Sequence, residues 1–199
     1  MFDRRLLIIF IKNPVKGNVK TRLAKTMGEE KALQIYKSLL NHTQEITVEL
    51  PCTKMVFYSD FVDENDNWKN EDYKKHLQHG INLGERMLNA FNLGFNKNFR
   101  EILIIGSDCF ELNKDIISKA FDALATSQFV IGPAKDGGYY LLGMKKIYKV
   151  IFENKIWSTA SVLADTIQDF EKNNASYFLL SKLTDIDEEK DLIESNFKY

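Results

Sequence analysis

The sequence predicts an α/β fold, a three-layer α/β/α sandwich with a mostly parallel mixed sheet. Unbroken apolar runs of strand length occur at residues 6–11 and 102–105, and such runs are typical of parallel strands that are buried on both faces. Segments with apolar residues at helical spacing alternate with the strands along the chain, which favours a sheet covered by helices on both sides. Because 199 residues suit one such unit, residues 1–199 are predicted to form a single domain.

The predicted elements follow from local signals. Pro14 and Gly17 end the first strand in a loop, Pro51 stops the first long helix, and Asn113 caps a later one. Ser158 or Thr159 is expected to cap the next helix, and Thr184 or Asp185 the last. In chain order we expect a strand at 6–11, a helix at 29–50, a strand at 55–59, a polar loop at 60–73, a helix at 83–95, a strand at 102–105, a helix at 114–125, strands at 129–131 and 139–144, a helix ending near 173, a strand at 177–180 and a short final helix.

Charge and cysteine content exclude several classes of function. The formal net charge is -1, so the chain has no overall field for nucleic acid or an anionic membrane. Two cysteines, Cys52 and Cys109, are too few for a disulfide scaffold and suggest a reducing compartment. The longest early apolar run is too short for a signal peptide or a membrane span. We therefore expect a cytoplasmic protein with no nucleic acid partner and no membrane insertion.

A basic segment follows the first predicted strand. It contains Lys12, Lys16, Lys20 and Arg22, and no acidic residue occurs between Leu6 and Gly28. Open α/β sheets bind ligands at the carboxyl ends of their strands; lysines offer point charges to phosphate, and arginine can bind two oxygens at once. Gly17 would let the backbone approach a ligand closely. A solvated basic face is an equally good interpretation, and no Walker A motif is present.

Asp108 follows the second buried strand in the segment Gly106-Ser107-Asp108. A carboxylate at this position is costly to bury unless it is paired or bound to metal. Because hard cations take carboxylate and phosphate oxygens together, Asp108 is a candidate ligand of Mg²⁺ or Mn²⁺. The alternative is that Asp108 caps a turn or the next helix.

Four other segments are weaker candidates, and each has a structural explanation. Paired glycines before a strand leave room for a ligand or form a tight turn, and a Trp before a helix start stacks on a substrate or on the protein core. Two acids in the final segment supply a second metal ligand or a helix cap. An Arg at a helix start implies an anionic partner or a surface salt bridge. The segments are Asp136-Gly137-Gly138-Tyr139-Tyr140, Trp157-Ser158-Thr159, Asp185-Ile186-Asp187 and Gly84-Glu85-Arg86.

Taken in order, these motifs resemble those of the DUF2064 family, which is similar to the GT-A, or nucleotide-diphospho-sugar transferase, superfamily. The resemblance covers nearly the whole chain. Two details differ, since Phe110 stands where the family usually has a proline, and Glu188-Glu189 where it often has Thr-Pro. The motifs are Lys12-x-Pro14-x-x-Gly17-x-Val19-Lys20-Thr21-Arg22-Leu23, Leu83-Gly84-Glu85-Arg86, Ile105-Gly106-Ser107-Asp108-Cys109, Gly132-Pro133-Ala134-x-Asp136-Gly137-Gly138-Tyr139-Tyr140-Leu141-Leu142-Gly143, Trp157-Ser158-Thr159 and Asp185-Ile186-Asp187.

The resemblance implies a GT-A fold, a nucleotide donor, a small-molecule acceptor and Mg²⁺ or Mn²⁺. The donor is expected to be a nucleotide sugar; a nucleoside triphosphate, as in a nucleotidyltransferase, and a non-catalytic nucleotide-binding module are the alternatives. Asp108 would hold the metal with Asp187 or Asp185, and Lys20, Arg22 and Asp136 would act in catalysis. The phosphate-binding candidates are Lys12, Lys16, Gly17, Lys20, Arg22, Gly84, Arg86 and Ser107, and the acceptor-side candidates are Gly137, Gly138, Tyr139, Trp157, Ser158 and Thr159.

Overall fold

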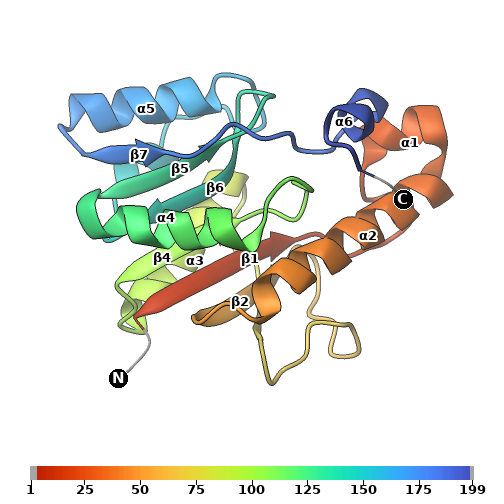
Figure 1. The fold of residues 1–199 in the computed structure, drawn as a ribbon, viewed down its shortest axis with the longest axis horizontal. Coiled ribbons are helices and arrows are strands. Elements are labelled where there is room, and N and C mark those ends of the chain that lie inside the picture. Colours follow the sequence, from red (N-terminus) through yellow and green to blue (C-terminus); the bar gives the residue numbers. More distant parts are fainter. Residues whose placement is uncertain (1–3, 198–199) are drawn as a thin grey trace.

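The computed structural model describes residues 4–197 and shows the predicted α/β/α sandwich (Figure 1). Strands and helices alternate along most of the chain. In order the elements are β1 (Arg5–Ile11), α1 (Thr21–Met27), α2 (Glu29–Val48), β2 (Thr53–Tyr58), β3 (Lys74–Leu77), α3 (Leu83–Asn96), β4 (Glu101–Ile105), α4 (Lys114–Thr126), β5 (Phe129–Pro133), β6 (Tyr139–Met144), the 3₁₀ helix η1 (Lys149–Phe152), α5 (Val162–Lys172), β7 (Tyr177–Leu179) and α6 (Glu189–Glu194).

The seven strands form one sheet in the order β3-β2-β1-β4-β6-β5-β7. Strand β1 pairs in parallel with β2 on one side and with β4 on the other, and only β6 runs against its neighbours. After β1 the chain builds outward to β2 and β3, and then returns to place β4 on the opposite side. The boundary between β1 and β4 is therefore the switch point at which open α/β sheets bind ligands.

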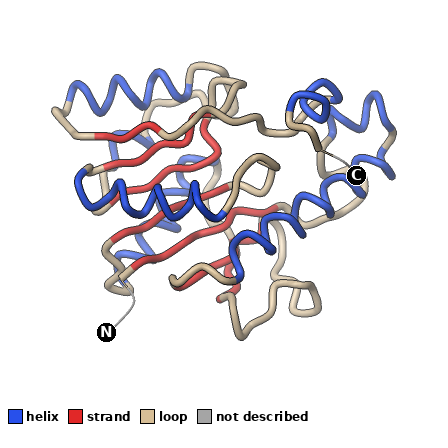
Figure 2. Tube along the Cα trace, in the orientation of Figure 1, coloured by secondary structure: helices blue, strands red, loops and turns tan. Residues whose placement is uncertain are grey.

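Successive side chains along each central strand point to opposite faces of the sheet and pack into two separate hydrophobic cores. On one face Leu7 and Ile9 of β1 belong to a cluster completed by α2 and α4. On the other face Leu6 and Ile8 belong to a cluster completed by α3, η1 and α5. Both faces of β1 are covered, which explains the unbroken apolar run in the sequence. Figure 2 shows the loops that leave the sheet where β1 and β4 end.

A third, smaller cluster joins the ends of the chain. Leu23 of α1, Ile35 and Leu39 of α2, and Ile186 and Leu192 from the C-terminal segment pack together. Figure 1 shows α1 and α6 side by side beyond the sheet edge, and this packing brings the basic N-terminal segment next to the final acidic segment.

Three elements were not expected from the sequence. Helix α1 has seven residues, and β3 and η1 have four each. Such short segments carry too few residues to show a periodic pattern. Strand β3 also lies at the sheet edge, where His76 and Leu77 are only partly buried, so it lacks the apolar run of the central strands.

Asn113 caps α4 as predicted, but the caps predicted for the last two helices are wrong. Helix α5 begins at Val162, after Ser158 and Thr159, and the Thr159 hydroxyl donates to the Ile156 carbonyl instead. Helix α6 begins at Glu189 with Glu188 as its cap, because the Asp191 carboxylate accepts the backbone N–H of Glu188 in a capping box. Thr184 and Asp185 precede that helix and belong to no helix or strand.

Within residues 4–197, every helix is too short or too polar to cross a bilayer. The longest, α2, has 20 residues and carries charged side chains on its exposed side.

Candidate active site

A cavity of about 450 Å³ opens at the switch point between β1 and β4. Its inner wall is apolar and includes Phe10 from β1, Ile104 from β4 and Leu142 from β6. Its mouth is polar and includes Lys12, which follows β1, and Asp108, which follows β4. An apolar cavity with a few converging polar groups is the usual form of a small-molecule site.

An ion cluster around Lys20 lies at the cavity mouth, where its partners Asp108 and Asp187 line the cavity. Its ammonium lies 2.7 Å from Oδ1 of Asp108 and 3.2 Å from Oδ1 of Asp187. The Lys20 side chain is 4% exposed, whereas Asp108 and Asp187 are 43% and 42% exposed. Burial lowers the pKa of Lys20 and the two carboxylates raise it, with a net increase. The ammonium therefore stays charged inside the protein.

The backbone of Lys20 is in a conformation that is rare for a residue with a side chain. Lys20 lies in the left-handed region, with φ 47° and ψ 45°, immediately before α1. Such conformations persist where the surrounding structure holds them, and they concentrate at functional sites. Here the two carboxylates and the packing of α1 hold Lys20 in place.

The basic segment predicted from the sequence divides into two parts. Arg22 comes within 3.9 Å of Oδ2 of Asp187 but is largely exposed, and Lys12 lines the cavity. Lys16 instead pairs with Glu30 on the surface, at 3.0 Å, and Gly17 lies next to Glu29. Since neither Lys16 nor Gly17 lines the cavity, the structure places both outside the candidate site.

Tyr36 of α2 organises the loops after β1 and β4. Its hydroxyl accepts the backbone N–H of Lys12 at 2.8 Å and lies 3.3 Å from the hydroxyl of Ser107. Burial raises the pKa of Tyr36, so it remains a neutral hydrogen-bonding group. The sequence showed Tyr36 only as part of an apolar helix stripe, and its role in positioning Lys12 and Ser107 was missed.

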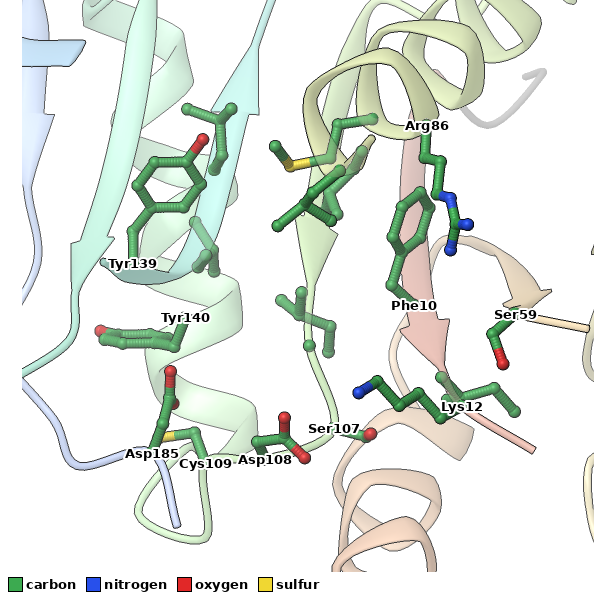
Figure 3. A pocket seen from close by; sticks show the side chains of 18 of the residues that line it. Phe10, Lys12, Ser59, Arg86, Ser107, Asp108, Cys109, Tyr139, Tyr140 and Asp185 are labelled. Carbon is green, nitrogen blue, oxygen red and sulfur yellow. The ribbon is translucent and has the colours of Figure 1, made fainter. Parts of the chain in front are cut away.

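Two cationic side chains face the carboxylates across the cavity. Figure 3 shows Lys12 reaching inward from the end of β1 and the guanidinium of Arg86 hanging from α3 beside Phe10. The Nε of Arg86 donates to the Gly80 carbonyl at 3.1 Å. Neither cation has a carboxylate within ion-pair distance among the described residues. Both are therefore available to an anionic ligand.

Gln78 is a second residue that the sequence analysis missed. Its side-chain NH₂ donates to the carbonyls of Ile11 and Phe57, at 3.0 and 2.9 Å, which ties together the ends of β1 and β2. Because the two carbonyls fix the amide nitrogen, the orientation of the side chain is settled. Gln78 lines the cavity and is an additional candidate for ligand recognition. A single glutamine after a short edge strand gives no sequence signal of this kind.

Asp185 lies between the main cavity and a neighbouring one of about 320 Å³, and it lines both. Its Oδ1 atom is buried with no hydrogen-bond partner among the described residues. Burial, together with repulsion from Asp108 and Asp136, raises the pKa of Asp185 to about 8. An uncompensated buried carboxyl of this kind is typical of functional sites.

The stability of the metal-free protein should therefore depend on Asp185 between pH 4 and 8. In the unfolded chain this carboxyl ionises near pH 4, whereas in the folded protein its pKa is about 8. The proton held by the folded state favours folding below pH 4, and that contribution is lost as the pH rises to 8. We expect Asp185→Asn to flatten this fall in urea unfolding measured with EDTA at pH 5, 6.5 and 8. Parallel wild-type and variant curves would contradict the burial of Asp185.

The residues predicted for the acceptor side form a packed corner. Trp157 covers Gly84, where an added Cβ would lie 2.4 Å from the indole ring. Gly137 has φ 92°, and a Cβ added to it would lie 2.2 Å from the carbonyl oxygen of Ala160. The space that a side chain would fill at Gly84 and Gly137 is therefore occupied by other parts of the protein and not by a ligand. This close packing lets the loops that carry Asp136 and Ser158 meet.

The other acceptor-side candidates lie at different depths. Ser158, with φ 63°, lines the main cavity, while Asp136 lines the neighbouring one and accepts the Gly138 N–H at 2.8 Å. Tyr139 lines the main cavity, although its hydroxyl is buried without a partner among residues 4–197. Thr159 is occupied with Ile156 and lines neither cavity.

The carboxylates partly fit a divalent cation. Asp108 and Asp187 both reach toward one position, now held by the Lys20 ammonium, and Asp185 adds a buried oxygen without a partner. No group of three His, Cys, Asp or Glu side chains within the described chain is arranged to hold a metal ion by itself. Two carboxylates suit a Mg²⁺ site that is completed by phosphate oxygens and water.

Comparison with known structures places the fold. The chain aligns with a provisionally named nucleotide-diphospho-sugar transferase from Desulfovibrio desulfuricans G20 at a TM-score of 0.88 and 27% identity, covering 96% of this chain and 85% of that one. It also aligns with the inositol-1-phosphate CTP transferase of T. maritima at 0.53 and 13%, covering 96% and 91%. The 4-diphosphocytidyl-2C-methyl-D-erythritol synthase of Anaerococcus prevotii DSM 20548 aligns at 0.55 and 13%, covering 96% and 94%. The last two likenesses concern the fold alone.

No curated protein sequence matches the chain. The family model of DUF2064, described as an uncharacterized protein conserved in bacteria, matches residues 43–159. This span includes Asp108, Arg86, the paired glycines and Trp157, and it makes up more than half of the chain. The protein therefore belongs to the DUF2064 family and has the fold of nucleotide-diphospho-sugar transferases.

Proposed function

We propose that this protein is a transferase that binds a nucleotide sugar in the cavity between β1 and β4 and acts with Mg²⁺ or Mn²⁺. The observation that carries the proposal is the position of Asp108, which follows β4 at the switch point and faces Lys12 and Arg86 across the cavity. Carboxylate on one side and unpaired cations on the other suit a diphosphate with a bound cation. The 27% identical structure from Desulfovibrio desulfuricans G20 supports the same class.

Each group has a defined role in this proposal. Asp108 and Asp187 would hold the cation, which when bound supplies positive charge to the phosphate oxygens and the leaving group. Lys12, Arg22 and Arg86 would bind and orient the donor phosphates. Tyr36 keeps Lys12 and Ser107 in place, and the apolar inner wall excludes water.

The acceptor would enter from the neighbouring cavity, which Asp136 and Asp185 line together with Lys135. Asp136 is exposed there and would remove a proton from the acceptor hydroxyl. Trp157, Ser158 and the loop of Gly137 and Gly138 would shape this side of the site.

Nucleotidyl transfer from a nucleoside triphosphate is the second candidate, and one observation favours it. Lys12, Lys20 and Arg22 line a single hollow of about 270 Å³ beside Asp108. Three cations match the charge of a triphosphate better than that of the diphosphate of a nucleotide sugar.

The reaction products decide between the two candidates. The protein would be incubated with Mn²⁺, nucleotide sugars and a panel of hydroxyl-bearing acceptors, and separately with Mn²⁺, nucleoside triphosphates and sugar phosphates. We expect release of a nucleoside diphosphate from a nucleotide sugar; release of pyrophosphate would establish nucleotidyl transfer instead. Nucleotides that raise the melting temperature without turnover in either panel would support a binding module and contradict both transfer reactions.

A further inference from the structure

We propose that Lys20 fills the cation position of the site in the free protein, so that a divalent cation binds only together with a polyphosphate that draws Lys20 away. This inference rests on the proposed function and adds an order of binding to it. It also gives Lys20 a role that differs from a fixed phosphate contact.

The first support is geometric. Oδ1 of Asp108 and Oδ1 of Asp187 come from loops far apart in the sequence and converge on the same atom, Nζ of Lys20, at 2.7 and 3.2 Å. Carboxylate oxygens that meet at one cation form the same arrangement that a metal would use, except that Mg²⁺ requires oxygen distances of about 2.1 Å. A small contraction would suit the metal once the ammonium has left.

The second support is the order of burial around the cluster. The Lys20 side chain is 4% exposed, whereas both carboxylates are more than 40% exposed. Asp108 and Asp187 line the main cavity, whereas Lys20 does not, so the ammonium lies behind the carboxylates as seen from that cavity. With Lys20 in place, a divalent cation would add two positive charges close to an ammonium that already pairs with Asp108 and Asp187. Mutual repulsion of the cations disfavours this arrangement.

The third support is the alternative partner that a ligand would offer. Lys20 also lines the hollow of about 270 Å³ that contains Lys12, Arg22 and Asp108. Phosphate oxygens bound there would accept the ammonium of Lys20 and leave both carboxylates to the cation. The left-handed backbone of Lys20 (φ 47°) is held by the packing of α1 and by the two ion pairs, so exchanging the ion pairs for phosphate contacts removes one of these two constraints.

The test measures Mn²⁺ binding, with no need for turnover. Water proton relaxation increases when Mn²⁺ tumbles with the protein, so titrations would compare Mn²⁺ alone with Mn²⁺ plus inorganic pyrophosphate. Mn²⁺ and pyrophosphate without protein give the background. For the wild-type protein we expect at least tenfold tighter Mn²⁺ binding with pyrophosphate than without it.

Replacing Lys20 should remove the need for pyrophosphate. Lys20→Met keeps most of the length of the side chain without its charge, and we expect it to bind Mn²⁺ alone at least tenfold more tightly than the wild type. Lys16→Met removes a lysine whose partner is Glu30 on the surface, and it should bind like the wild type. Adding Asp108→Asn to Lys20→Met should abolish the gain, because the metal loses one of its two carboxylates.

Equal affinity of wild type and Lys20→Met for Mn²⁺ alone, at any level, would overturn the inference. If circular dichroism shows that Lys20→Met does not fold, the wild-type titrations still decide, since equal affinity with and without pyrophosphate would also overturn it. Failure of the proposed function looks different. The Mn²⁺ pattern would remain as expected, but no nucleotide donor would be turned over.

Discussion

Asp108→Asn is expected to lower kcat/KM for transfer by about 10²- to 10⁴-fold, because it removes one of the two carboxylates that would hold the cation at the reacting phosphate. Asparagine has nearly the same shape, so the cavity should keep its form. The measurement is steady-state kinetics with Mn²⁺ and the donor identified by the product assay, together with urea unfolding of the same protein. A decrease of less than threefold would remove Asp108 from the metal site.

A second lysine–aspartate pair provides the matched control. The side chain of Lys75 in β3 is also 4% exposed, and its ammonium lies 2.8 Å from Oδ1 of Asp66, which is in the loop between β2 and β3. Neither residue lines the cavity. Asp66→Asn and Asp108→Asn should each lower the free energy of unfolding by about 1–3 kcal/mol, since both leave a buried ammonium with a weaker partner. Only Asp108→Asn should lower kcat/KM, so a similar loss in both variants would indicate a general effect of stability.

Gly137→Ala is expected to reduce the free energy of unfolding by about 3–5 kcal/mol. The added Cβ would lie 2.2 Å from the carbonyl oxygen of Ala160 and 2.7 Å from two further backbone atoms, and the backbone of Gly137 has φ 92°. Backbone cannot rotate away as a side-chain tip does. The loops that carry Asp136 and Ser158 would therefore separate, which should weaken acceptor binding as well. Urea unfolding measures the first effect, and KM for the acceptor measures the second.

Gly28→Ala separates the two causes of this loss. Gly28 has a similar φ of 85°, but a Cβ added to it would have no atom within 4 Å. It should therefore show only the backbone cost, about 1–3 kcal/mol. The excess loss in Gly137→Ala then measures the contact between the two loops. Equal losses in both variants would mean that the loops are not pressed together at Ala160.

The sequence was most informative where a physical signal extends over many residues. The apolar runs at 6–11 and 102–105 gave the central strands β1 and β4, and their carboxyl ends gave the position of the cavity. Asp108 could be singled out because a carboxylate directly after a buried strand conflicts with burial. The structure adds its partner Lys20, which in the sequence was one of several similar lysines.

The remaining features depend on packing between distant segments, and no local pattern contains them. Lys16 and Lys20 look alike in the sequence, yet one pairs with Glu30 on the surface and the other is buried between two carboxylates. Gly84 was a candidate for phosphate binding, whereas its missing side chain accommodates Trp157. Tyr36 has the spacing of a core residue and also a hydroxyl that holds Lys12. Such roles emerge only when the complete fold brings the segments together.

The hydrogen bond between Lys20 and Asp187 spans 167 residues, and this span has a consequence for synthesis on the ribosome. At about 5–20 residues per second, Asp187 follows Lys20 by on the order of ten seconds or more. During the last part of that interval the lysine has Asp108 but not Asp187 as a partner, and α1 lacks the packing that α6 later provides. The mouth of the cavity is thus assembled at the end of folding, after the central strands have already paired.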